Sequence, residues 1–269
     1  MIPFTKAHAY GNDFLYVPAA AVERMASDRL ACALCDRHTG IGADGLVLYT
    51  VTANGASMTL LNADGSPSEV SGNGVRGLAA ILLRNHADVS ATTVVSTDAG
   101  AKTLTRTAHN GARQTFVASM GAPRDLRRVW TEVDGSPLEL IVLNFGNPQC
   151  VVLGPLPDLG AFHRMGPALE RHELFPARTN VEFAHVERAD LVRILIWERG
   201  VGPTTSSGTG SCAALIAAVA FGGANRQAQV AAPGGTQRVD WREDGVYLTG
   251  DAEILFDGTW ISDRTEIAY

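Results

Sequence analysis

Ser71-Gly72-Asn73-Gly74-Val75-Arg76 is a glycine-rich turn that leads straight into an apolar run over 77–83. The same pattern returns as Ser207-Gly208-Thr209-Gly210-Ser211, ahead of a second apolar run over 212–221. Glycines in such a turn permit positive φ and close approach of a ligand, and the following helix offers free N–H groups and a positive dipole end. Each turn therefore predicts the start of a helix that attracts anions, with a serine hydroxyl beside it.

The two turns are part of a longer internal repeat with an offset of 135 or 136 residues. Gly11-Asn12 matches Gly146-Asn147, and Gly65 matches Gly200, with apolar strand-like segments in the same register. Solenoids have many copies of a short repeat, whereas this repeat is long and has only two copies. We therefore expect two structurally related halves with a site in the cleft between them.

Secondary-structure signals indicate an α+β fold in which each half wraps a curved sheet around a central helix. Short apolar segments between Gly, Asn and Asp turns are typical of strands. Helices are expected over 20–36, 74–85, 159–169 and 210–222. The predicted halves are residues 1–120, joined by a C-terminal strand over 252–269, and residues 121–251.

The composition is that of an ordinary soluble globular protein. The 269 residues are 46% hydrophobic and 19% charged, and the net charge of −6 gives no support for nucleic-acid binding. No signal peptide and no apolar run long enough to span a bilayer is evident, so the cytoplasm is the expected compartment and a membrane partner is not expected.

Several cofactor classes lack their usual sequence signatures. The only lysines, Lys6 and Lys102, lie outside any phosphate-cradling context, which argues against pyridoxal phosphate. Nucleotide-binding glycine motifs are missing as well. Cys32 and Cys35 form a CxxC pair without a second pair to complete a zinc site, and we interpret them as small buried hydrophobic residues on a short helix. No cofactor and no metal are expected.

A series of ordered motifs runs over nearly the full length of the chain. They are His8-Ala9-Tyr10-Gly11-Asn12-Asp13-Phe14, the segment 36–45, Asn62-Ala63-Asp64-Gly65-Ser66, Gly72-Asn73-Gly74-Val75-Arg76, Gly146-Asn147-Pro148, Arg178-Thr179-Asn180-Val181-Glu182, Glu198-Arg199-Gly200 and Ser207-Gly208-Thr209-Gly210. With these motifs the chain resembles diaminopimelate epimerases. The resemblance implies conversion of LL- to meso-diaminopimelate, a step toward lysine and cell-wall precursors, by an enzyme that needs no pyridoxal phosphate.

The resemblance also implies roles for individual residues. In the family, a cysteine at each helix start works on one face of the substrate α-carbon, as thiolate base or thiol acid; the matching positions here are Ser71 and Ser207. The reacting carboxylate would be held by the helix N–H groups at Gly72, Asn73, Gly208 and Thr209. The amino groups and distal carboxylate would be bound by Asn12, Asn62, Asn147, Asn180, Glu198 and Arg199. The expected partner is a small amino acid, and a homodimer stays open.

The sequence departs from the family pattern at the chemical centre. Both cysteines are serines, the histidine expected after Gly-Asn-Pro is Gln149, and the acid expected near position 203 is Pro203. An alcohol is a far weaker acid than a thiol, so weak or altered activity is expected. Cys212, five residues past Ser207, is interpreted as a core residue, and Arg76 as paired with Glu69 or solvated. Two alternatives remain open: an inactive amino-acid-binding paralogue, and an isomerase or dehydratase of another small amino acid.

Overall fold

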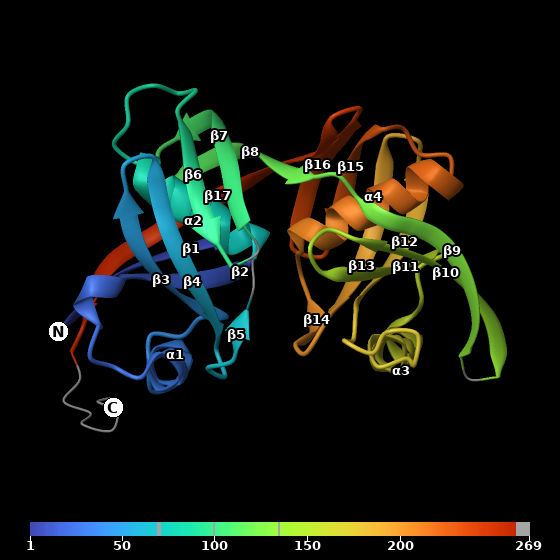
Figure 1. The fold of residues 1–269 in the computed structure, drawn as a ribbon, viewed down its shortest axis with the longest axis horizontal. Coiled ribbons are helices and arrows are strands. Elements are labelled where there is room, and N and C mark those ends of the chain that lie inside the picture. Colours follow the sequence, from blue (N-terminus) through green and yellow to red (C-terminus); the bar gives the residue numbers. More distant parts are fainter. Residues whose placement is uncertain (69–70, 99, 134, 262–269) are drawn as a thin grey trace. The chain divides into compact units, whose positions relative to one another are not determined.

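The computed structural model of the chain describes residues 1–68, 71–98, 100–133 and 135–261. These residues form two compact units. The first comprises Met1–Ala118 and the C-terminal residues from Gly250 on, and the second comprises Ser119–Thr249. Each unit is a β-rich structure with one central helix, α2 in the first and α4 in the second (Figure 1).

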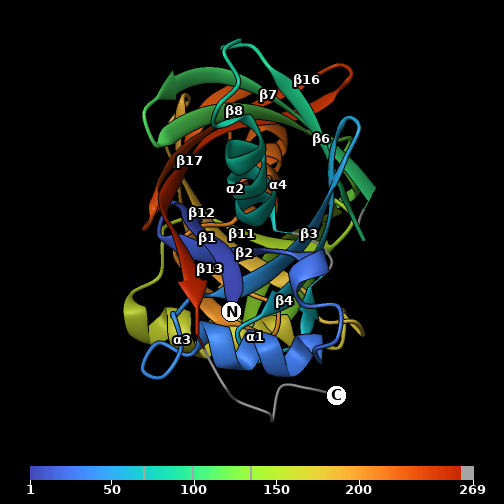
Figure 2. The ribbon, with the colours of Figure 1, turned by 90° about the vertical axis from the view of Figure 1, so that its left-hand side faces the viewer.

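In the first unit, α2 packs against strands that come from the whole length of that unit. Its elements are β1 (Ile2–Ala9), β2 (Asn12–Pro18), the short η1 (Ala19–Ala21), α1 (Ser27–Cys35), β3 (Gly45–Thr52), β4 (Gly55–Asn62), β5 (Pro67–Ser68), α2 (Gly72–Leu83), β6 (Thr92–Thr97), β7 (Gly100–Asn110), β8 (Arg113–Gly121) and the end of β17 (Gly245–Trp260). Strands β6, β7 and β8 curve over α2, while α1 lies on the outside (Figure 2).

The second unit repeats this order around α4. Its elements are β9 (Arg124–Val133), β10 (Ser136–Asn144), β11 (Pro148–Leu153), α3 (Leu159–Glu170), β12 (Asn180–Arg188), β13 (Leu191–Glu198), β14 (Gly202–Thr204), α4 (Gly208–Phe221), β15 (Gln227–Ala232), β16 (Gly235–Arg242) and the start of β17. Ten residues of α4 are buried, most of them Ala, Gly, Ser or Cys, because a helix surrounded by strands has no solvent face.

Strand pairing confirms the predicted pseudo-symmetry. The β2–β3 pair is parallel with Phe14 opposite Gly45, and the β11–β12 pair is parallel with Gln149 opposite Asn180. Both partners are displaced by 135 residues between the units. The following pairs also match, since β3–β4 and β12–β13 are antiparallel whereas β4–β6 and β13–β15 are parallel. The α+β class and the two related halves follow from this.

One predicted helix is shorter than expected. The apolar pattern over 20–36 predicts a single helix, but the chain forms η1, a turn and then α1 from Ser27. The turn is closed by Met25 N–H donating to the Val22 carbonyl, and both side chains pack into the same core as α1. Tertiary packing of these two residues therefore overrides the helical periodicity.

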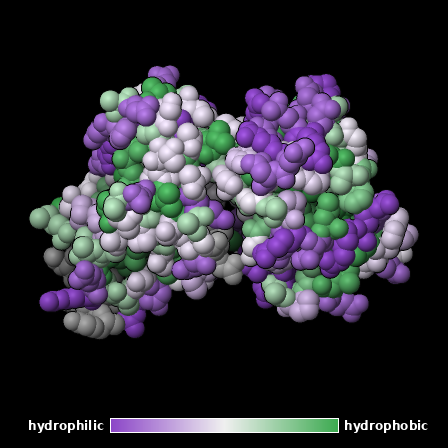
Figure 3. Space-filling view, turned by 45° about the horizontal axis from the view of Figure 1, so that its top comes forward, coloured by the Kyte–Doolittle hydropathy of each residue, from purple (hydrophilic) through white to green (hydrophobic). Residues whose placement is uncertain are grey.

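The described surface is that of an ordinary globular chain. Hydrophobic side chains on the face in Figure 3 are scattered among polar ones. Among the described residues, the helices are all too short or too polar to cross a bilayer. Of the strand predicted over 252–269, residues 252–260 belong to β17, and residues 262–269 lie outside the described part of the chain.

Candidate functional site

Ser71 is the residue at which α2 begins. Its backbone is extended (φ −123°, ψ 121°), and its Oγ accepts a hydrogen bond from Gly74 N–H at 3.2 Å. This is the geometry of an N-cap, for which serine is among the preferred residues. The first N–H groups of any helix point out of its start, and at α2 these are the N–H groups of Gly72 and Asn73.

Ser207 begins α4 in the same way. Its backbone is again extended (φ −140°, ψ 130°), and its Oγ accepts from Gly210 N–H at 3.2 Å. Ser207 is buried, whereas Ser71 is half-buried. Two helix starts with the same cap therefore present N–H groups from Gly72 and Asn73 in one unit and from Gly208 and Thr209 in the other, as anion sites require.

In the first unit, two predicted binding residues lie together at the start of α2. Asn73 Nδ2 donates to Asn12 Oδ1 at 3.1 Å, which connects the helix to the beginning of β2. Arg76, one turn further along α2, donates to Asn73 Oδ1 and lies over the ring of Tyr10. Arg76 is only 1% exposed, so the interpretation as a solvated charge is wrong; Glu69 lies outside the described residues.

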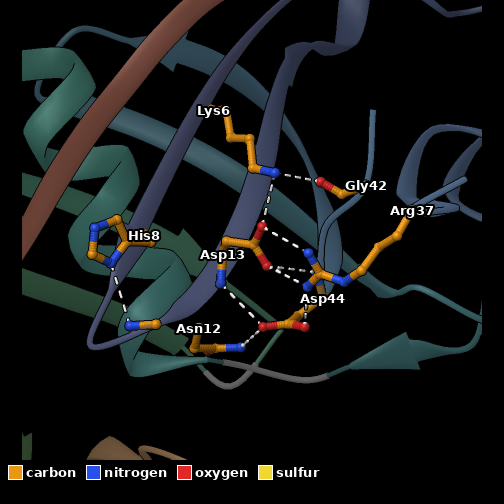
Figure 4. A network of polar contacts seen from close by, with 8 residues as sticks. Lys6, His8, Asn12, Asp13, Arg37, Gly42 and Asp44 are labelled. Carbon is orange, nitrogen blue, oxygen red and sulfur yellow. Dashed lines mark hydrogen bonds and ion pairs between the residues drawn. The ribbon is translucent and has the colours of Figure 1, made fainter. Parts of the chain in front are cut away.

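Asn12 is held in place by a network of charged residues (Figure 4). Its Nδ2 donates to Asp44 Oδ2 at 2.9 Å, and Arg37 bridges Asp44 and Asp13. Lys6 Nζ pairs with Asp13 at 2.9 Å. Burial opposes ionisation of Asp13, but the hydrogen bonds from Arg37 and Lys6 outweigh it and lower the pKa of Asp13. The network was not part of the predicted site, because its residues are far apart in the sequence.

Asn62 is placed in the first unit, but by different contacts. Its Nδ2 donates to Ser66 Oγ at 3.0 Å, within the turn that follows β4. Its backbone lies opposite Gly45, which begins β3. Asn62 is therefore positioned by the turn over 62–66.

In the second unit, Asn147 lies at the start of α4. Its Nδ2 approaches Thr209 Oγ1 at 3.4 Å, and its Oδ1 accepts from Gln149 Nε2 at 2.8 Å. Gln149, which stands where the family resemblance implies histidine, is fully buried. It therefore orients Asn147 rather than facing solvent.

Asn180 and Arg199 form a second pair in this unit. Asn180 Oδ1 accepts from the Arg199 N–H at 2.9 Å. The buried Glu170 holds the next turn, because its carboxylate accepts from Gly200 N–H and from Trp197 Nε1, each at 3.0 Å. Glu198 and Arg199 are both half-buried. Glu170 and its role were missed, since a lone glutamate in a helix carries no sequence signal.

Cys35 and Cys212 are buried, as interpreted from the sequence, but the interpretation of Cys32 as a buried residue is wrong. The buried face of α1 is formed by Leu30, Ala31, Leu34 and Cys35, and Cys32 lies off that face. Cys212 is fully buried in the core around α4. Cys35 is buried and Cys32 is exposed, and burial raises the pKa of the Cys35 thiol to about 12. A buried thiol of this kind is inert at neutral pH.

The chain is similar in sequence to known proteins of one family. The sequence matches the family model described as "Diaminopimelate epimerase" over residues 4–125 and 141–255. It is 39% identical to the diaminopimelate epimerase of Desulforudis audaxviator over 278 residues, which covers 96% of this chain and 99% of that protein. It is 36% identical to the enzyme of that name from Synechococcus elongatus, with 96% and 98% covered.

Solved structures share the fold at low sequence identity. A probable proline racemase from Agrobacterium radiobacter K84 superposes with a TM-score of 0.76 at 15% identity, covering 99% of this chain and 94% of that one. A hydroxyproline epimerase from Agrobacterium vitis gives a TM-score of 0.72 at 16% identity, with 96% and 91% covered.

Proposed function

The chain belongs to the diaminopimelate epimerase family and is an isomerase of the racemase and epimerase type, and we propose that it exchanges the α-proton of diaminopimelate or a closely similar amino acid without a cofactor. The observation that carries this proposal is the pair of serine-capped, glycine-rich helix starts, each with an asparagine in contact with its first turn.

The helix starts supply the electrostatic part of the reaction. Removing an α-proton places negative charge on the substrate, and this charge spreads into its carboxylate. N–H groups that already point at the carboxylate stabilise that charge without reorganising. Gly72 and Asn73 in one unit, and Gly208 and Thr209 in the other, are the proposed donors. Asn12, Asn62, Asn147, Asn180, Glu198 and Arg199 are the proposed contacts for the substrate's remaining polar groups.

The proton-transfer part is weak in this chain. Ser71 and Ser207 are the proposed catalytic residues, and a serine hydroxyl does not ionise in the range where a helix-capping thiol does. Each serine oxygen also accepts its cap hydrogen bond at 3.2 Å. We therefore expect slow exchange.

Deuterium incorporation at the α-carbon of diaminopimelate in heavy water tests the proposal. The wild-type protein should exchange far below ~10 s⁻¹, a rate typical of efficient enzymes. The double variant Ser71→Cys/Ser207→Cys should exchange faster. The double variant Ser68→Cys/Ser206→Cys, which adds thiols outside the helix caps, should match the wild type. Absence of exchange from both the wild type and the helix-cap double variant would contradict the proposal.

A second candidate function is amino-acid binding without turnover. The cap hydrogen bonds favour it, since serine is among the best N-cap residues and fulfils a structural role here without any chemistry. Calorimetric binding of diaminopimelate by the wild type, together with no exchange in the helix-cap double variant, would select this function.

A further inference from the structure

Glu182 is an ionisable residue with apolar residues on both neighbouring strands. It lies on β12 between Val151 of β11 and Ile196 of β13, both of which pack in the core around α4. Its side chain is fully buried, and within the described part of the chain neither carboxyl oxygen has a hydrogen-bond partner. An ionised carboxylate in such a place costs several kcal/mol, so burial favours the neutral form of the group. Burial, with the charge of Glu198 adding to it, holds the pKa of Glu182 well above its usual value.

The carboxyl group of Glu182 points at the first turn of α4. A Cβ atom added to Gly210 would lie 2.7 Å from Glu182 Oε1 and 3.2 Å from Ser207 Oγ. Both oxygens thus lie beside the same small residue, and a side chain at 210 would displace the carboxyl group. The Ser207 oxygen accepts from Gly210 N–H, which leaves its own O–H proton to be donated elsewhere.

A second buried acceptor accompanies Glu182. Gln149 Oε1 is buried and has no hydrogen-bond partner among the residues that the structure describes, although the Nε2 of the same amide donates to Asn147. Gln149 lies opposite Asn180, two residues before Glu182 on β12, so strand alternation places Gln149 and Glu182 on the same face of the sheet. Acceptors left without donors on one face are the arrangement expected where a proton is held or exchanged.

We propose that Glu182 exchanges a proton with Ser207, directly or through one water molecule, and so performs the task for which the serine hydroxyl alone is too weak. This inference rests on the proposed function. When the α-proton leaves the substrate, it bonds to the Ser207 oxygen, while the Ser207 O–H bond breaks and its proton passes to the ionised Glu182 carboxylate. The electron pair stays on the α-carbon. In the reverse direction neutral Glu182 returns the proton.

Glu182 acts through Ser207 and is not itself a catalytic residue. Other titratable groups around it are Glu198 on β13 and Cys150 on β11, and burial raises the pKa of the Cys150 thiol, with Glu182 adding to the effect. Proton removal needs the ionised form of Glu182, so exchange that proceeds through Ser207 should increase with pH through the raised pKa.

The first test measures α-proton exchange in Glu182→Gln, which keeps the shape of the side chain and removes its proton. Exchange should fall about 100-fold or more and lose its increase with pH, with an unchanged KM. Thermal unfolding shows whether the variant is folded. If the wild type exchanges and the variant does so within twofold and with the same pH profile, the inference is wrong while the proposed function stands.

The second test does not need activity. The pKa of Glu182 can be followed by carbon NMR on protein with labelled glutamate. The proposal makes Ser207 the donor to the ionised carboxylate, directly or through water. Ser207→Ala removes this donor, so the pKa of Glu182 should move further upward. Ser71→Ala, which removes the same cap in the other unit, should leave it unchanged. An unchanged pKa in Ser207→Ala overturns the inference, even if the wild type proves to have no exchange activity.

Discussion

The starts of α2 and α4 share a backbone but differ in their buried charge. Each has a serine cap with a 3.2 Å bond to the third helix residue. Five residues after the cap, however, α2 carries the buried Arg76 and α4 the buried Cys212. On the strand beneath, the register places Val47 in the first unit where Glu182 stands in the second. One fold therefore supports a fixed positive charge at one helix and a titratable group at the other.

This difference separates the attraction of an anion from the exchange of a proton. Arginine does not lose its proton in proteins, so the α2 start can attract an anion but offers no proton from that side chain. A buried glutamic acid can exchange its proton. Under the proposed function, both helix starts would bind a carboxylate, whereas proton exchange is expected to be unequal between the units.

The largest effect is expected where the units pack differently around their helices. Tyr16 Oη donates to the Gly74 carbonyl, and a Cβ atom on Gly77 would overlap this hydroxyl. The matching residue of α4 is Ala213, facing the Val151 strand. Gly77→Ala should lower the free energy of unfolding by about 3 kcal/mol through overpacking. Ala213→Gly should cost only about 1 kcal/mol. Urea unfolding of both variants measures the difference, and equal losses would contradict it.

The second prediction concerns a variant whose α4 start resembles the α2 start, because it has an apolar residue at the position that matches Val47. Glu182→Leu replaces a buried carboxyl that lacks partners by an apolar side chain, and should stabilise the protein by about 1–3 kcal/mol at pH 7.

The stabilisation by Glu182→Leu should depend on pH. The pKa of Glu182 is raised in the folded protein, so its contribution to stability is fully present below the unfolded value, about 4.3, and is lost as pH rises through the folded value. The advantage of the variant should therefore grow with pH. A constant difference in melting temperature between pH 4 and 8 would show that Glu182 has an ordinary pKa.

The serine caps should contribute equally in both units. Ser71→Ala and Ser207→Ala each remove one N-cap bond and should each cost about 1 kcal/mol, measured by urea unfolding. The matched glycine variants should cost only a few tenths of that. A loss confined to one variant would mean that only that serine is a structural cap.

The smallest effect is expected in the network around Asn12. Arg37 is half exposed, so Arg37→Ala should cost less than about 1 kcal/mol at pH 7. The pKa of Asp13 is lowered, so its stabilisation is present above about pH 3.9 and is lost as pH falls through the folded value. Asp13→Asn should therefore flatten the acid side of the stability profile, which is opposite to the effect expected of Glu182. An unaltered acid limb in thermal unfolding would contradict this.

The sequence predicted what depends on local pattern. The apolar runs behind both turns predicted helices within two residues of their observed starts, because the glycines of each turn proved to be the first helical residues. The 135-residue offset predicted the repeated fold, since turns and apolar strands mark register directly. The turn at 22–26 was missed, because Val22 and Met25 are fixed by contacts with distant strands.

Site residues were predictable only where a motif carries them. The asparagines and serines stand in motifs, but their contacts could not be read from spacing. Arg76 and Glu182 are also in those motifs, yet nothing in the amino-acid sequence indicates that either side chain is buried. Burial of a charge is a property of the assembled sheet and helix, and it decides which of the two helix starts can carry a proton.

Strand β17 sets the order in which the chain can fold. It begins in the second unit, and its later residues pair with the first strand of the chain, Ile2 opposite Trp260. During synthesis the first unit therefore cannot close until residues near 260 have left the ribosome, because β1 lacks this neighbour before then. The second unit can complete most of its pairing earlier, so the part of the chain made first is expected to mature last.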